Sequence, residues 1–245
     1  AAQQRALDID PNLIEAATGL TNMRTERGEL RQSYEAASRR VRELPRHALT
    51  HFSLSYVLRF MGRLEEAVRE CEVAYGLDPQ MRLRSCATPY TLLGNYRRAH
   101  DFLDLDAGSD WVANKRAAIY VREKRLDEAL AIWRELPADY AGAGFWTACL
   151  AEEKREVLDR LSRRSEQNTA AAFDPEVKYW NASLQAWCGY HQAALRLLET
   201  AVDQNYCSWP AVDLDPLWDP LRDDDEFLRI RAEAMACHQR YVELR

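Results

Sequence analysis

The chain has few of the residues and patterns that define most enzyme and membrane-protein classes. Only 9 of its 245 residues are glycine, and it contains no GxGxxG, GxxxxGK[ST] or GxSxG motif for a nucleotide or a nucleophilic serine. No apolar run approaches the roughly 18 residues that a transmembrane helix requires. The net charge of −6 provides no general basic field. We therefore expect no membrane partner, and nucleic acid is disfavoured as a partner.

The six cysteines are widely spaced and form no recognisable motif. They include no CxxC pair and no neighbouring histidine at zinc spacing; they lie at positions 71, 86, 149, 188, 207 and 237. His47 and His51 have the i, i+4 spacing of a zinc half-site, but the glutamate of HExxH and a third ligand are missing. We expect reduced structural thiols, no metal, no cofactor and a cytoplasmic location.

An acidic stretch near the end of the chain, LDPLWDPLRDDDEF at residues 214–227, invites a comparison with calcium-binding loops. A DxDxDG loop that began at Asp213 would need Asp or Asn at position 217 and Gly at position 218. The chain has Leu217 and Trp218 there. The stretch therefore predicts proline-set turns followed by a helix rather than a metal site.

Prolines and glycines punctuate the chain at a constant interval. Pro11, Pro45 and Pro79 are 34 residues apart, and the same step separates Gly28 from Gly62. This period is typical of repeats made of two helices. Each unit begins with a helix after the proline, turns at the glycine and ends its second helix at the next proline. The sequence thus predicts an all-α array of helical hairpins.

The segment FMGRLEEAVRECEVAYGLDP, residues 60–79, resembles the tetratricopeptide repeat family. The family's signature positions are occupied by Gly62, Leu64, Ala67, Cys71, Ala74 and Pro79, with cysteine in place of the usual aromatic residue. The resemblance covers about residues 1–205, and Lys124 stands where a glycine is expected. It implies a right-handed α-solenoid whose inner, concave face is lined mainly by the first helix of each unit.

We divide the chain into a half-repeat, six repeats and a cap. The ranges are 1–11 for the half-repeat, 12–45, 46–79, 80–108, 109–137, 138–173 and 174–208 for the repeats, and 209–245 for the cap. The third repeat is irregular and the fifth is degenerate. A solenoid needs a cap because its last apolar face has no successor. In the capping helix, we expect Asp223 or Asp224 to begin the helix and Phe227, Leu228 and Ile230 to pack on the last hairpin.

The family resemblance also implies a set of groove positions. These are Thr18, Asn22, Thr25, Phe52, Tyr56, Arg59, Phe60, Trp111, Asn114, Ala118, Arg122, Tyr179 and Ser183. Phe52, Tyr56 and Phe60 are four residues apart on one helical face, so together they form the best candidate for a peptide-binding surface. For each aromatic residue alone, packing against the next helix is an equally good expectation. The clamp that holds chaperone carboxylates is absent, because Thr18 replaces its lysine.

These observations favour a non-catalytic scaffold or sensor that binds a protein or peptide in the concave groove. The tail at residues 214–227 is similar to the tails of tetratricopeptide regions in bacterial signalling proteins with kinase, cyclase or winged-helix domains, and it implies the C-terminal part of such a protein. One alternative is an enzyme with a hydrolase-type site in the irregular middle, near Cys86, His100, Asp101 and Cys149.

A second alternative is self-assembly through the ends of the array. Residues 1–10 align with the second helix of a repeat whose first helix is missing, which leaves Leu7 without a cover. We expect either end-to-end homo-association or fraying before about residue 12.

Overall fold

The computed structural model describes residues 2–10, 13–137, 140 and 142–244. These residues form helices, turns and loops and contain no β-strand. After α1 (Ala2–Ile9), the helices follow one another as antiparallel pairs. The pairs are α2 (Ile14–Glu26) with α3 (Leu30–Glu43), α4 (Ala48–Phe60) with α5 (Leu64–Leu77), α6 (Ala87–Leu92) with α7 (Tyr96–Asp104), α8 (Asp110–Arg122) with α9 (Leu126–Glu135), α10 (Ala143–Leu150) with α11 (Arg155–Ala170), and α12 (Pro175–Trp187) with α13 (His191–Asp203). The predicted all-α array of helical hairpins is confirmed.

The turns inside the hairpins use a left-handed backbone conformation, as the glycine spacing predicts. Gly28 and Gly62 have φ angles of 77° and 76°. Glycine adopts such angles without the steric cost that a Cβ atom brings. Lys124, which stands in a glycine position, also has a positive φ of 61°. The repeat geometry therefore holds even where the signature residue is lost.

The irregular third unit begins with a 3-10 helix, η1 (Arg84–Cys86), which leads directly into the short helix α6. The first helix of this unit is short but is not broken by proline, because Pro89 is a buried residue inside α6. The last segment consists of α14 (Trp209–Leu214), the 3-10 helix η2 (Pro216–Leu221) and the long helix α15 (Asp225–Val242).

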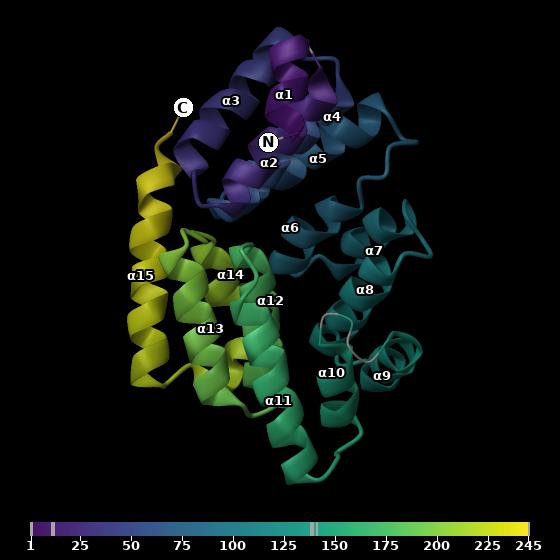
Figure 1. The fold of residues 1–245 in the computed structure, drawn as a ribbon, viewed down its shortest axis with the longest axis vertical. Coiled ribbons are helices and arrows are strands. Elements are labelled where there is room, and N and C mark those ends of the chain that lie inside the picture. Colours follow the sequence, from purple (N-terminus) through teal and green to yellow (C-terminus); the bar gives the residue numbers. More distant parts are fainter. Residues whose placement is uncertain (1, 11–12, 138–139, 141, 245) are drawn as a thin grey trace.

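The array does not stay open, because its late helices return to its early ones. Figure 1 shows the path running from α1–α5 through α6–α10 to α11, and then back along α12–α15, so that the C-terminal end lies beside α3. One hydrophobic core contains buried side chains from α3, α4 and α5 together with side chains from α12, α13, α14 and α15. The predicted α-solenoid of stacked hairpins is therefore confirmed, and its curvature closes it into a ring.

Hydrogen bonds and one close ring contact fasten this closure at the turn of the second hairpin. The N–H of Cys207 donates to the carbonyl oxygen of Phe60 at 2.9 Å, and the His238 ring nitrogen Nδ1 lies 2.7 Å from the carbonyl oxygen of Met61. Arg63 donates to the carbonyl oxygen of Leu244 at 2.8 Å. Cys207 and His238 thus supply partners for carbonyl groups at the end of α4, and Arg63 supplies one for a carbonyl group at the end of the chain.

The capping helix α15 lies against α13 and α14. Asp224 caps it by accepting hydrogen bonds from the backbone N–H groups of Glu226 and Phe227, which confirms one of the two predicted caps. Phe227 and Ile230 are fully buried, but Leu228 is 41% exposed. The prediction that Leu228 packs on the last hairpin is wrong, because it follows Phe227 by one residue and faces away from the core.

All six cysteines are paired in disulfides within the described part of the chain. The pairs are Cys71–Cys86, Cys149–Cys188 and Cys207–Cys237. The expectation of reduced thiols is therefore wrong. Each bridge joins elements of consecutive units or of the cap, so that each pair is close in the fold but 15 to 39 residues apart in the sequence.

No helix in the described ranges combines the length and the apolar character needed to cross a bilayer.

Candidate functional site

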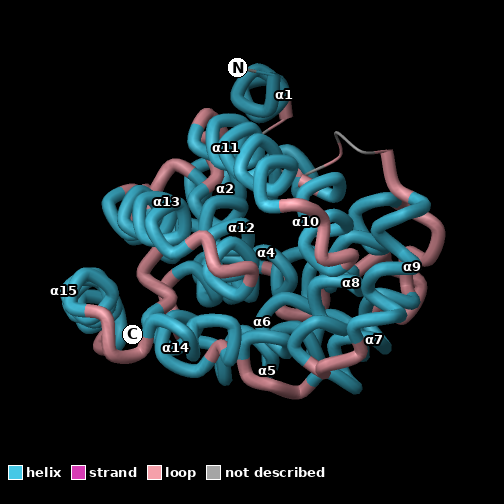
Figure 2. Tube along the Cα trace, turned by 90° about the horizontal axis from the view of Figure 1, so that it is seen from below, coloured by secondary structure: helices cyan, strands magenta, loops and turns pink. Residues whose placement is uncertain are grey.

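A cavity of ≈ 530 Å³ lies where α4, η1, α8 and α12 approach one another. Helices α4 and α12 lie near the middle of the molecule when it is viewed from below, and the label of α8 lies to one side of them (Figure 2). The lining residues come from units that are distant in the sequence: Phe52, Tyr56, Arg59, Arg82, Arg84, Ser85, Asp106, Trp111, Asn114, Lys115, Tyr140, Asp174, Glu176, Val177, Trp180 and Asn181. Ring closure creates this cavity, because α12 is brought opposite α4 only when the array closes. We call it the central pocket.

A buried ion pair joins the two sides of the central pocket. The Arg59 guanidinium donates from Nε and Nη2 to the two carboxylate oxygens of Glu176 at 2.9 and 2.8 Å. Its remaining nitrogen, Nη1, donates to the hydroxyl and carbonyl oxygens of Ser85 at 2.6 and 3.1 Å. The Arg59 guanidinium also stacks 3.9 Å above the ring centre of Tyr56. Arg59 therefore links α4 to η1 and α12, and these contacts fix the position of its side chain.

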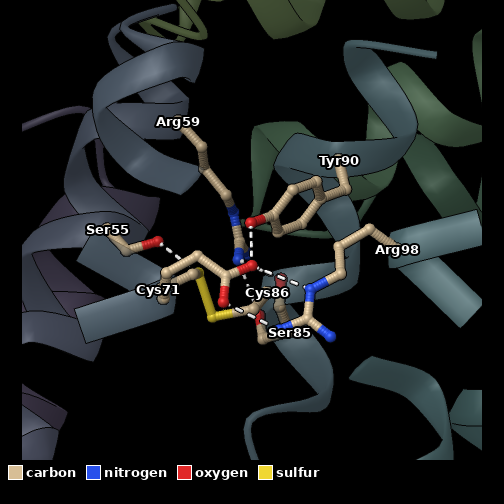
Figure 3. Close-up of a disulfide and its surroundings, with 8 residues drawn as sticks. Ser55, Arg59, Cys71, Ser85, Cys86, Tyr90 and Arg98 are labelled. Atoms are coloured by element: carbon tan, nitrogen blue, oxygen red, sulfur yellow. Dashed lines mark hydrogen bonds and ion pairs between the residues drawn. A yellow bond between two sulfur atoms is a disulfide. The ribbon is translucent and has the colours of Figure 1, made fainter. Parts of the chain in front are cut away.

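A disulfide supports the wall that carries Ser85. Figure 3 shows the bond between Cys71 and Cys86 beside Arg59 and Ser85. Because Cys86 follows Ser85 directly, the bond holds η1 against α5 and keeps the Ser85 oxygens within reach of Arg59. The disulfide is thus part of the structure that shapes the pocket.

Asp174 is a carboxyl group with unusual protonation. It begins α12 and accepts a hydrogen bond from the backbone N–H of Glu176 at 2.8 Å. Burial and the neighbouring charge of Glu176 raise the pKa of Asp174 to about 7, although the hydrogen bond and the Arg59 charge act in the opposite direction. Near neutral pH, Asp174 therefore exists as a mixture of the acid and the carboxylate.

Lys115 contributes an ammonium group among aromatic rings. Its Nζ lies 3.4 Å from the ring centre of Trp180 and 5.7 Å from that of Trp111. Burial lowers the pKa of Lys115 well below its usual value; the charges of Glu176 and Asp174 oppose this shift, whereas that of Arg59 adds to it.

The entrance of the central pocket carries two arginines and one aspartate. Arg84 forms an ion pair with Asp106, and Arg82 lies 3.5 Å from the other oxygen of the same carboxylate. Arg82 is largely exposed. The Arg84 guanidinium also lies 5.1 Å from the ring centre of Trp111. The rim thus has one more positive than negative charge.

Several residues of the predicted groove lie together in the central pocket. They are Phe52, Tyr56 and Arg59 from α4, and Trp111 and Asn114 from α8. Asn114 also accepts a hydrogen bond from the Trp133 indole at 2.8 Å, so its oxygen is already occupied. Tyr56 donates to Glu26 at 2.7 Å. Phe52 and Trp111 are half-buried, and neither side chain forms a hydrogen bond within the described part of the chain.

Other predicted groove residues are placed elsewhere. Phe60 is fully buried and packs edge-on against Tyr206, so it cannot share a ligand surface with Phe52 and Tyr56. The buried group also includes Thr18, Thr25, Ala118, Arg122, Tyr179 and Ser183, whereas Asn22 is half-buried on α2, away from the pocket lining. Ring closure buries Phe60, Arg122 and Tyr179 against residues of the late helices, whereas Thr18 and Thr25 lie on α2, which packs against the neighbouring helices α1, α3 and α4.

Eleven of the sixteen residues that line the central pocket are not predicted from the sequence. Lys115, Asp174, Glu176 and Trp180 all line it. Two signals were available: Lys115 follows Trp111 by four residues, which places both on one helical face, and the Asp174–Pro175 pair is a typical helix start. Neither signal shows that α12 returns to face α4.

The residues of the alternative, hydrolase-type site all interact with other residues. Cys86 and Cys149 are in disulfides, so neither supplies a thiolate nucleophile. His100 lies 3.0 Å from Glu123, and Asp101 lies 3.2 Å from Arg98. Among the described residues, no group of three or more His, Cys, Asp or Glu side chains is arranged to hold a metal ion. In particular, His51 Nδ1 is 2.6 Å from Glu70.

No protein-family model matches the chain, and no curated protein matches it. Among solved structures, the chain is similar to a chain of the crystal structure of the APC/C hetero-tetramer Cut9-Hcn1, with 14% sequence identity and a TM-score of 0.40. The match covers 95% of this chain and 51% of that one, so the present chain spans about half the length of its structural neighbour. At this identity and TM-score, the likeness has no bearing on function.

Proposed function

We propose that the chain is a non-catalytic binding module that holds a short peptide segment of a protein partner in the central pocket. The observation that carries this proposal is the convergence of α4, η1, α8 and α12 on a cavity of ≈ 530 Å³ with aromatic walls and a few placed polar groups. Cavities of roughly 300–1,000 Å³ with this mixture are typical ligand sites. Half-buried Phe52 and Trp111 supply the apolar contact that anchors side chains in protein interfaces.

The pocket determines how much of a partner can enter. Its volume suits one or two side chains rather than an extended peptide, so we expect the rest of the segment to lie over the rim beside Arg82 and Arg84. The side chains of Arg59 and Glu176 are nearly inaccessible to solvent. Their ion pair links the two walls of the pocket and is not expected to contact the ligand. We therefore assign recognition of the bound segment to the aromatic walls and to the polar groups that have no partner among the described residues.

We also propose that the module is the sensor part of a larger bacterial signalling protein, a reading supported by the tail at residues 214–227. The disulfides refine where it would act. Disulfides persist in oxidising compartments and are rare in a reducing cytosol. With all six cysteines paired, we propose an oxidising compartment in place of the cytoplasmic location expected from the sequence.

Selection of phage-displayed random peptides on the purified, oxidised protein tests the binding function. Peptides that use the central pocket should bind Phe52→Ala and Trp111→Ala at least about tenfold more weakly than the unmodified protein, because each change removes an aromatic anchor. Leu228→Ala is the matched control, since Leu228 is an exposed apolar residue on α15 outside the pocket. Circular dichroism and thermal unfolding establish that all variants are folded.

Two results would contradict the proposal. Selection could yield no peptide that binds the free protein in solution, which would remove the evidence for peptide recognition. Alternatively, selected peptides could bind the two pocket variants as tightly as the control, which would place recognition on another surface.

A further inference from the structure

The charged groups of the central pocket are paired, with one exception. Arg59 is matched by Glu176, and Asp106 by Arg84 and Arg82. Asp174 receives the N–H of α12. Lys115, in contrast, forms no hydrogen bond or ion pair with any described residue, and its Nζ lies over the face of the Trp180 ring. Within the described ranges, the N–H donors of the Lys115 ammonium group therefore have no oxygen or nitrogen acceptor.

An unpaired ammonium group is costly in such a place. It has three N–H donors, and an aromatic face satisfies none of them as fully as an oxygen acceptor does. Lys115 is half-buried, and its partial withdrawal from water without a compensating partner disfavours the charged form, which is consistent with the lowered pKa of Lys115. An oxygen acceptor with a negative charge, placed beside Nζ, would satisfy these donors.

We propose that Lys115 receives an anionic group of the bound segment, a carboxylate or a phosphate attached to an apolar or aromatic body. This inference rests on the proposed function and specifies its ligand chemistry. The aromatic body would contact Trp111, and the anion would lie beside Lys115. Arg84 is also within reach of the Trp111 ring, so a second cation lies on the same side of the site.

The same arrangement predicts the direction of the pH dependence. A bound anion favours the ammonium form of Lys115 and the neutral form of Asp174, so binding should take up protons and weaken as the pH rises. The charged groups that set this response are Arg59 and Glu176 across the pocket, Asp174 before α12, Arg84 in η1 and Arg122 on the same helix as Lys115.

Four small probes with one aromatic ring test the inference on the whole chain. Benzoate and phenyl phosphate carry the two anionic groups, benzamide is an uncharged relative of benzoate, and benzylamine carries the opposite charge. Binding is measured by calorimetry at pH 6 and pH 8 and by the 13Cε NMR signals of the four lysines. The key variant is Lys115→Met, and Lys154→Met is its control, because Lys154 is exposed at the start of α11.

We expect at least one anionic probe to bind the unmodified protein and Lys154→Met equally, and to bind Lys115→Met about tenfold or more weakly, because a charge-assisted hydrogen bond is lost. Benzamide and benzylamine should also bind the unmodified protein about tenfold or more weakly than this anionic probe does. The comparison of benzoate with phenyl phosphate decides which anion the site accepts. The Lys115 signal should move on binding, and binding should be tighter at pH 6 than at pH 8.

Equal binding of benzoate and benzamide, an unchanged affinity in folded Lys115→Met, or no binding of either anion would overturn the inference. These failures are separable from a failure of the proposed function. Selected peptides that depend on Phe52 and Trp111 but ignore Lys115 would retain the peptide site and remove the anion site. Anion binding that depends on Lys115, without any selected peptide, would contradict peptide recognition alone.

Discussion

The Asp215 carboxylate and the Arg122 guanidinium form a 2.6 Å ion pair in which both side chains are 1% exposed. Asp215 also accepts a hydrogen bond from the Tyr179 hydroxyl at 2.8 Å. Asp215 belongs to the acidic stretch near the end of the chain, whereas Arg122 ends α8 and Tyr179 lies on α12. The first aspartate of that stretch is therefore a buried counter-ion that ties the capping segment to two earlier hairpins.

Replacement of Asp215 by alanine should be strongly destabilising. The change leaves the Arg122 charge buried without its partner, and breaking such a pair costs about 3–5 kcal/mol of unfolding free energy. Urea denaturation measures the loss. Asp219→Ala is the control, because Asp219 pairs with Arg222 at the surface and exposed pairs contribute about 0–1 kcal/mol. Equal stability losses in the two variants would show that the buried pair has no special role.

The ring closure predicts different effects for the same substitution at two glycines. Gly62 and Gly94 both have positive φ angles, so alanine should cost about 1–2 kcal/mol at either position from backbone strain. A Cβ atom at Gly94 would have no neighbour within 4 Å, whereas one at Gly62 would lie 2.7 Å from His238 Nδ1 and 2.9 Å from the Cys207 carbonyl oxygen.

Gly62→Ala should therefore be clearly less stable than Gly94→Ala in urea denaturation. It should also have a larger radius of gyration in solution scattering, because the cap has to move away from the second hairpin. Indistinguishable stability and size for the two variants would argue that the ends of the array do not meet.

Asp174 should make the stability of the protein depend on pH. Its pKa is about 7 in the folded chain, whereas an aspartate in an unfolded chain titrates near about 3.9. Between these values the folded form binds a proton that the unfolded form has lost, so the free energy of unfolding should fall as the pH rises from about 4 to about 7. The slope from one such group is at most about 1.4 kcal/mol per pH unit.

Asp174→Asn isolates this contribution. Asparagine stays neutral and keeps a side-chain oxygen for the N–H of Glu176, so the variant should lack the slope that Asp174 produces. Denaturation curves at several pH values between 4 and 7.5 compare the two proteins. Parallel stability profiles would rule out a strongly raised pKa for Asp174.

The disulfides predict the thiol content of the protein. Protein prepared without reductant, unfolded and treated with an alkylating reagent should show no modified cysteine by mass spectrometry. Reduction should lower the unfolding free energy by about 2–4 kcal/mol for each bridge, since each bridge restricts the unfolded chain. Modification of all six cysteines in never-reduced protein would contradict the observed pairing.

The local features of the fold were accessible from the sequence because local residues determine them. The 34-residue step located the hairpin turns at Gly28 and Gly62, and Asp224 with its following acidic residues marked the start of α15. The closure of the ring was not accessible in this way. It depends on contacts such as that between Phe60 and Cys207, which are far apart in the chain and have no periodic signature.

The same limit explains the mistakes about the site. Phe60 and Tyr179 have the spacing of groove residues, but closure buries both of them. No sequence pattern singles out Lys115, because its significance comes from Trp180, which lies on a different hairpin. The cysteines were misread for a related reason, since no short spacing motif links partners separated by 15, 30 or 39 residues.

The contacts between Met61 and His238 and between Phe60 and Cys207 also restrict how such a chain can evolve. An open array has stability that is roughly a sum over neighbouring units, so it can gain or lose one unit with little effect on the others. In the closed array, a duplicated hairpin would place the cap beyond the second hairpin, and a deleted one would leave the cap too far away to reach it. Closure thus fixes the number of hairpins between the second hairpin and the cap, and it couples the unfolding of these hairpins to one another.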